Sequence, residues 1–144
     1  MIDVKELFVG AWVQVLDCPT PERVLAIYRG ITGDCIHLTD LECAAGLIVY
    51  ATKVEPVAIS HTILEGNGFK QSEDRCNEWI LDIAERRNDN DVRVFLYENS
   101  GDWTFQCMSC GLGYQHELTK CYIKNLHQLQ VALKLSGIHY EIGI

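Results

Sequence analysis

The sequence predicts an α+β protein that is mostly β: a small antiparallel barrel, followed by an antiparallel meander packed by a C-terminal helix. Three observations predict this class. Short stretches of alternating hydrophobicity, typical of strands, recur along the chain. Clusters of Gly, Pro, Asn and Asp separate these stretches, as turns do. One longer stretch near the C-terminus repeats its apolar residues at helical spacing.

The first sixty residues contain five predicted strands. One helical turn is expected over residues 3–8, with Asp3 as its cap. The strands are predicted at 12–16, 23–28, 35–38, 46–51 and 54–59. Two prolines make 17–21 a loop, Gly33 supplies the positive φ of a tight turn, and Pro56 favours an edge position. Five short strands broken by turns predict a small barrel, for which we favour an SH3-like form.

A helical junction is predicted at residues 61–70. Ser60 or Thr62 can cap a short helix, because their hydroxyl oxygens accept hydrogen bonds from the first free N–H groups of a helix. Gly66 and Gly68 are expected to end this helix, since glycine readily adopts the left-handed conformation of a C-terminal cap.

The remaining residues predict an antiparallel sheet and its covering helix. Strands are expected at 78–84, 92–97, 103–107 and 117–123. The domain organisation is therefore a small β-barrel-like lobe at 1–60, the junction at 61–70, and the sheet with its C-terminal helix at 71–144.

The closing helix, predicted at 126–136, has both of its ends specified by the sequence. Asn125 is a favourable N-cap, and Gln128 resembles the second member of a capping box. Gly137 suits the left-handed position after the helix, and Ile138 completes the pattern of a Schellman motif. One face shares residues at helical spacing that we expect to pack on the sheet: Leu126, Leu129, Ala132, Leu133 and Ser136.

Composition and charge restrict the classes of function. The net charge of −8 argues against nonspecific binding to nucleic acid or a membrane surface, because phosphate attracts basic surfaces. Seven cysteines without an export signal indicate a cytoplasmic protein with free thiols. The sequence contains no glycine-rich phosphate loop, nucleophile elbow or His-Glu-x-x-His motif, so it does not predict an enzyme.

One set of cysteines and a histidine has spacing close to that of a metal site. Cys107, Cys110, His116 and Cys121 follow C-x2-C-x5-H-x4-C, one residue longer than the zinc knuckles that bind single-stranded nucleic acid. A Cys-x2-Cys turn followed by glycine lets two thiolates converge on one zinc ion. Alternatively, Cys107 continues the alternation of the preceding aromatic residues and is buried as a small apolar side chain.

Two segments carry a resemblance to a known family. Residues 63–70 read ILEGNGFK, and residues 125–133 read NLHQLQVAL. Both resemble segments of a family of small uncharacterised proteins from Bacteroidetes, often associated with prophages or mobile elements. The shared order of strands, junction, strands and helix covers most of the chain. Val131 departs from the family pattern, which often has Asn there. The family lacks the cysteine set, so the resemblance implies no shared zinc site.

These observations predict a non-enzymatic protein that binds another protein or assembles with itself, without a cofactor. His127 and Gln130 are the residues of the closing helix that folding leaves unexplained, so we identify them as candidates for a contact surface. The alternative is a zinc-knuckle-like module that binds nucleic acid through the cysteine and histidine set.

Overall fold

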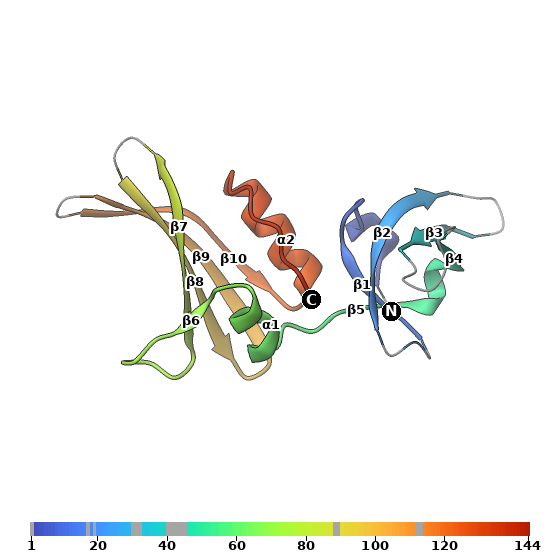
Figure 1. Ribbon diagram of the computed structural model, residues 1–144, viewed down its shortest axis with the longest axis horizontal. Helices are drawn as coiled ribbons and strands as arrows, with labels where there is room; N and C mark the ends of the chain where they lie inside the picture. The colour runs from blue at the N-terminus through green and yellow to red at the C-terminus, as the bar shows by residue number, and fades with distance from the viewer. Residues whose placement is uncertain are drawn as a thin grey trace. The chain divides into compact units, whose positions relative to one another are not determined.

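The computed structural model describes residues 2–16, 18, 20–29, 33–39, 46–87, 90–111 and 114–144, with only the backbone of 84–87 and 90. The chain forms two compact units, Met1–Ala58 with Asn125–His127, and Ile59–Lys124 with Gln128–Ile144. Each unit contains a five-stranded antiparallel sheet, and a helix lies near the end of the chain (Figure 1). The predicted α+β, mostly β class is therefore confirmed.

The first sheet has the strand order β4-β3-β2-β1-β5. The elements of this unit are η1 (Val4–Glu6), β1 (Trp12–Val15), β2 (Pro21–Tyr28), β3 (Cys35–Leu38), β4 (Leu47–Tyr50), η2 (Ala51–Lys53) and β5 (Val54–Pro56). Pro56 lies on an edge strand as predicted, because proline has no N–H to give to a second ladder. The single turn η2 joins the two edge strands, β4 and β5. The SH3-like form stays a prediction.

In the first unit, the predicted helix cap and the predicted turn glycine are both observed. Asp3 caps η1, since its Oδ1 accepts a hydrogen bond from the backbone N–H of Lys5 at 2.9 Å. Gly33 has a φ of +136°. The predicted strand at 46–51 ends one residue early, because Ala51 begins η2. Asp17 and Pro19 of the predicted loop lie outside the described residues.

The core of the first unit consists of residues on the inner side of its sheet and of residues near η1 and η2. Its buried residues are Ile2, Leu7, Ala11, Val13, Val15, Val24, Ile36, Leu38, Ala51 and Val54. Those that lie on β1, β2 and β3 alternate with more exposed neighbours, as a sheet with one buried face requires.

The second sheet is a meander with the strand order β10-β9-β8-β7-β6. The elements of this unit are α1 (His61–Gly66), β6 (Lys70–Gln71), β7 (Glu78–Arg87), β8 (Asn90–Asn99), β9 (Asp102–Gly111) and β10 (Tyr114–Ile123), and α2 (Leu126–Leu135) follows. Four strands have ten residues each, so they are longer than predicted. Pairing with a neighbouring strand extends them through polar stretches that do not alternate in hydrophobicity.

The predicted junction forms α1 and begins β6. Ser60 caps α1, because its Oγ accepts a hydrogen bond from the N–H of Ile63 at 3.3 Å. Gly66, predicted to help end the helix, lies inside its last turn. Gly68 instead takes the left-handed conformation, with a φ of +74°, as glycine does after a helix.

The helix α2 ends in the predicted Schellman motif. Gly137 has a φ of +69°, and its N–H donates to the carbonyl of Lys134 at 2.9 Å. The N–H of Ile138 donates to the carbonyl of Leu133 at 3.0 Å, which completes the motif. At the other end, Gln128 Oε1 accepts from the N–H of Lys124 at 2.8 Å. The side chain of Gln128 therefore bonds the backbone of Lys124, one residue before the predicted N-cap Asn125.

The core of the second unit lies between α2 and one face of the second sheet (Figure 1). From the helix, Leu129, Ala132 and Leu133 are buried, as the helical spacing predicts. The sheet contributes alternate residues of three strands: Trp79, Leu81, Val92, Val94, Leu96, Trp103, Phe105 and Cys107. In the part of the chain that the structure describes, no helix is long and apolar enough to cross a membrane.

Candidate functional site

The predicted metal ligands lie on two paired strands rather than on a loop. Cys107 and Cys110 both belong to β9, which stays extended through Gly111. Side chains three residues apart in a strand point to opposite faces and lie roughly 10 Å apart along it. Cys107 is fully buried on the face toward α2, whereas Cys110 projects from the other face. The two thiols therefore do not form the converging turn that a zinc knuckle needs.

His116 and Cys121 lie on β10, opposite Ser109 and Phe105 of β9. These pairs are four residues apart along β9, which separates them by roughly 13 Å. Burial raises the pKa of the Cys121 thiol, which disfavours the thiolate that binds zinc. The structure thus does not bring the four residues together. Over the described ranges, no group of three or more His, Cys, Asp or Glu is placed to hold a metal ion.

The predicted contact residues of the closing helix lie deeper than expected. His127 has 1% of its surface exposed, and its Nε2 lies 3.5 Å from Glu6 Oε2 within the first unit. Its Nδ1 has no hydrogen-bond partner in the described part of the chain. Burial lowers the pKa of this imidazole, against an opposing effect of the Glu6 carboxylate. Gln130 is half-buried.

Exposed apolar side chains gather on the outer face of the first sheet. Cys35 of β3 pairs with Tyr28 of β2 on one side and with Tyr50 of β4 on the other. The next row along β3 places His37 opposite Ile48. Residues directly opposite in an antiparallel pair project to the same face. We call these five residues, Tyr28, Cys35, His37, Ile48 and Tyr50, the outer face of the first sheet.

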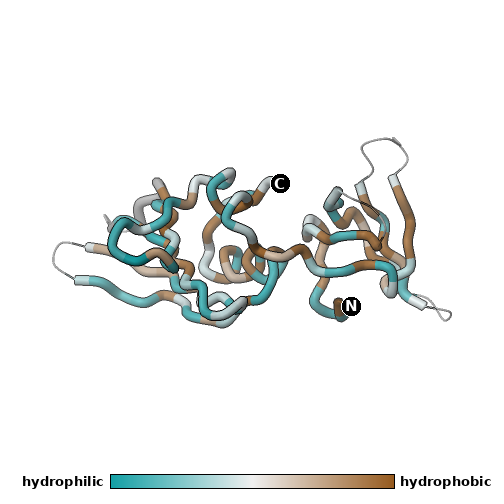
Figure 2. The backbone as a smooth tube through the Cα atoms, turned by 90° about the horizontal axis from the view of Figure 1, so that it is seen from below, coloured by the Kyte–Doolittle hydropathy of each residue, from teal (hydrophilic) through white to brown (hydrophobic). Residues whose placement is uncertain are grey.

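The largest side chains of this face are more than half exposed. Tyr28 is 52% exposed, Ile48 61% and Tyr50 57%. Figure 2 colours most of β4 as hydrophobic. Neither face of β4 is fully buried, so its run of four large residues, Leu47–Tyr50, leaves apolar surface on the outside. The sequence signal for this face was therefore the unbroken apolar run, which predicts a strand without telling which side is covered.

Two shallow hollows, whose charged residues have opposite signs, lie next to Tyr50. One, of about 420 Å³, is lined by Cys35, Ile48, Val49, Tyr50 and Lys53. The other, of about 360 Å³, includes Tyr50 together with the carboxylates Asp3 and Asp34. Tyr50 thus lines both hollows, one with a single cationic side chain at its rim, Lys53, and one with two carboxylates at its rim. An apolar centre with charged groups at its edge is the usual composition of a protein-binding surface.

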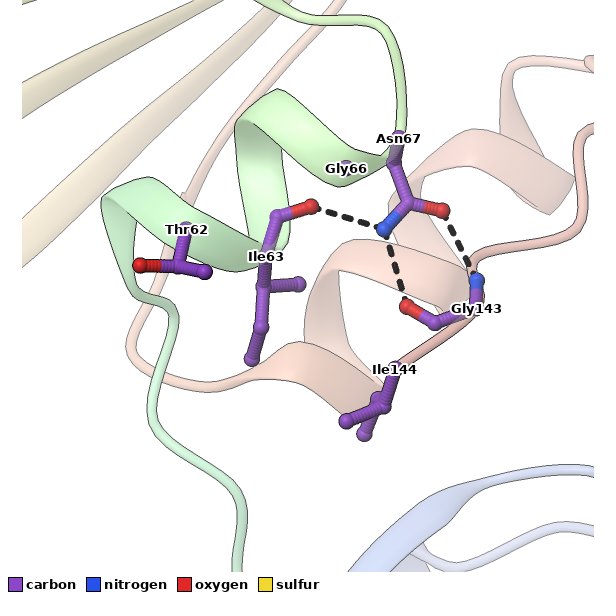
Figure 3. Close-up of a pocket in the computed structure, with 6 residues that line it drawn as sticks. All are labelled: Thr62, Ile63, Gly66, Asn67, Gly143 and Ile144. Atoms are coloured by element: carbon purple, nitrogen blue, oxygen red, sulfur yellow. Dashed lines mark hydrogen bonds between the residues drawn. The ribbon is translucent and has the colours of Figure 1, made fainter.

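A third hollow, of about 310 Å³, lies between α1 and the C-terminal segment (Figure 3). Its polar centre is Asn67, whose Nδ2 donates to the carbonyls of Ile63 at 2.7 Å and Gly143 at 2.8 Å. Its Oδ1 accepts from the N–H of Gly143 at 2.7 Å. Both N–H donors of this amide are occupied, so Asn67 attaches the C-terminal segment to α1 and offers no donor to a ligand.

The same contacts explain the distinctive junction residues 63–70. Leu64 and Phe69 are buried, Asn67 binds the C-terminal segment, and Gly68 needs its left-handed φ. The segment is therefore accounted for by packing and backbone geometry. Comparison of the chain with family models, with curated proteins and with solved structures finds no significant match.

Proposed function

We propose that this chain is a non-enzymatic protein-interaction module that binds another protein through the outer face of the first sheet. The observation that carries the proposal is the alignment of Tyr28, Ile48 and Tyr50 on neighbouring strands, each more than half exposed. Contiguous exposed apolar side chains of this kind mark interaction sites. Tyrosine is also among the residues that contribute most binding energy at the centre of interfaces.

The rims of the two hollows define the chemistry of the partner. A complementary surface presents an apolar side chain to Ile48, an acidic group toward Lys53 and a basic group toward Asp3 and Asp34. Complementary charges at the rim set the orientation of a complex and speed its formation more than they strengthen it. The buried aromatic and aliphatic contacts supply most of the affinity.

The resemblance to proteins of prophages and mobile elements from Bacteroidetes supports a role in the assembly of such an element. A cytoplasmic location is part of the same proposal, since the cysteines that the structure describes are free thiols, which persist in a reducing compartment.

Affinity capture with matched variants tests the proposed surface. The full chain, an Ile48→Asp variant and a Val9→Asp variant serve as baits in a lysate of the source organism. Val9 is the matched control, because it is 65% exposed in the same unit but lies outside β2, β3 and β4. Circular dichroism first establishes that both variants fold.

We expect Ile48→Asp alone to lose the bound protein, by at least about tenfold. The protein so identified is then purified, and calorimetry measures its affinity for the wild type and for Tyr50→Ser. If all three baits retain the same proteins, or if Tyr50→Ser binds as tightly as the wild type, the outer face of the first sheet is not the binding site.

A further inference from the structure

We propose that two copies of this chain pair antiparallel along β10, at a surface separate from the outer face of the first sheet. β10 is the last strand of its sheet, and along its free edge it pairs with no other strand among the described residues. It has ten residues, Tyr114–Ile123, most of them exposed. A long edge strand presents a row of backbone N–H and C=O groups that can pair with another strand.

A bulge in β10 decides which of its side chains share a face. Glu117 lies opposite Met108 of β9, and Thr119 lies opposite Cys107, so Leu118 is an extra residue between them. The extra residue shifts the alternation by one position. Glu117 and Lys120 therefore project from the same face, although three residues separate them in the sequence.

The shared face makes β10 complementary to a second copy of itself. When two β10 strands run antiparallel with Glu117 opposite Lys120 of the second copy, the two-fold axis repeats this ion pair a second time. The opposed pairs outside the bulge also project to a common face in that register: Gln115 with Tyr122, His116 with Cys121, and Tyr114 with Ile123. No other residue of the strand carries a formal charge when His116 is neutral, so two copies meet without net repulsion.

The bulge itself does not interrupt this pairing. Both copies carry their extra residue beside the two-fold axis, where Leu118 of each lies opposite Thr119 of the second copy. Because the extra residue is present in both strands, the two strands keep the same pairing register on both sides of the axis. A bulge and a lysine on an edge strand discourage pairing with strands in general. Here they favour one partner and one register.

The side chains of β10 support a second copy as the occupant of this edge. Tyr122 is 83% exposed and Tyr114 60% exposed, and pairing places each beside a side chain of the second copy. Most of the strand is hydrophilic (Figure 2), so its free edge suits a partner that matches its charges. Glu117 is already held in position, since Gln106 Nε2 donates to its Oε2 at 2.6 Å.

Charge exchange on the full chain tests the pairing. Sedimentation equilibrium over about a hundred-fold range of protein concentration measures the dissociation constant of the dimer. We expect the wild type to dimerise. Glu117→Lys and Lys120→Glu each place like charges opposite twice, so each should weaken dimerisation at least about tenfold. The double variant restores both ion pairs and should return the dissociation constant to within about threefold of the wild type.

Two control variants make the same changes of charge elsewhere in the second unit. Lys70→Glu lies on β6 at the opposite edge, and Glu73→Lys lies in the exposed segment that follows β6. Both should leave the dimer intact. Circular dichroism verifies folding, and hydrogen exchange should show β10 amides more protected at high protein concentration.

Three results would overturn the pairing along β10. The first is a wild-type chain that stays monomeric at every concentration. The second is a dimer that either single variant leaves unchanged, or that the double variant fails to restore. The third is a dimer lost in Ile48→Asp and retained in Lys120→Glu, which would place the contact on the first sheet instead. None of these results decides whether the first sheet binds another protein.

Discussion

The two sheets of this protein differ in how they cover their apolar residues. In the first, β3 and β4 have four residues each, and the helical elements η1 and η2 have three. Val13, Val24 and Ile36 on its inner face are fully buried, yet Ile48 and Tyr50 remain exposed outside. In the second, ten-residue strands bury one face beneath α2. The contrast teaches that a covering helix, rather than hydrophobic content alone, decides where apolar surface stays exposed.

The edges of the two sheets differ as well. β4 has four residues and β5 has three, and β5 ends in Pro56. Short edge strands and proline hinder pairing with other chains. β10 has ten residues and exposes most of them. The first sheet is therefore suited to binding through side chains, and the second through its backbone edge.

The largest effect is expected from truncating the helix that covers the second sheet. Leu133 is 1% exposed, so Leu133→Ala should lower the free energy of unfolding of the second unit by about 2–5 kcal/mol. Amide hydrogen exchange under native conditions reports each sheet separately. The control is Leu135→Ala on the same helix, because Leu135 is 77% exposed and its loss should change stability by less than about 0.5 kcal/mol. An equal loss of protection in β1 to β5 would show that the two sheets do not have separate cores.

An intermediate effect is expected from the imidazole buried in the first unit. Burial lowers the pKa of His127 in the folded chain below its ordinary value of 6.5. As pH falls from about 6.5 toward the folded pKa, the unfolded chain binds a proton that the folded chain does not. The free energy of unfolding should therefore decrease as the pH is lowered through this window, by at most about 1.4 kcal/mol per pH unit.

Urea denaturation at pH values on both sides of this window measures the slope for the wild type and for His127→Gln. The variant lacks the titrating group, so its stability should depend less on pH there. The carboxylates and the other histidines are common to both proteins and cancel in the difference. Identical slopes would mean that His127 is protonated alike in the folded and unfolded chains.

The smallest effect is expected on the outer face of the first sheet. Ile48→Ala removes a side chain that already faces solvent, so it should change the free energy of unfolding by less than about 0.5 kcal/mol. Ile36 belongs to the same sheet but is fully buried, and Ile36→Ala should cost about 2–5 kcal/mol. Thermal or urea denaturation of both variants measures the difference. Similar losses would show that Ile48 contributes to the core rather than to a binding surface.

Much of the local structure could be predicted because its causes lie within a few residues. Asp3 and Ser60 cap helices, and Gly137 ends α2, each through hydrogen bonds to residues within five positions. The apolar face of α2 follows from its spacing in the same way. Strand lengths were harder to predict, since β10 continues through the polar residues 114–117 only because β9 pairs with them.

The candidate sites could be predicted less well, because each depends on partners far away in the sequence. The spacing of Cys107 and Cys110 suits a metal-binding turn, but pairing with β8 and β10 keeps β9 extended and points the two thiols to opposite faces. His127 resembles a surface residue of a helix, yet it is buried near Glu6, 121 positions earlier. The spacing of residues along the chain does not reveal that β9 pairs with β8 and β10, or that Glu6 lies near His127.

By itself, then, the sequence determined the α+β class, the order of all the longer strands and of α1 and α2, and several of the caps and turns that bound them. Only the tertiary structure decided which side of each strand is covered and where β10 bulges. A cap is a contact between near neighbours, so residue types suffice to predict it. The exposure of Ile48 and the shared face of Glu117 and Lys120 depend on strand pairing and on the bulge at Leu118, which arise only when distant segments meet.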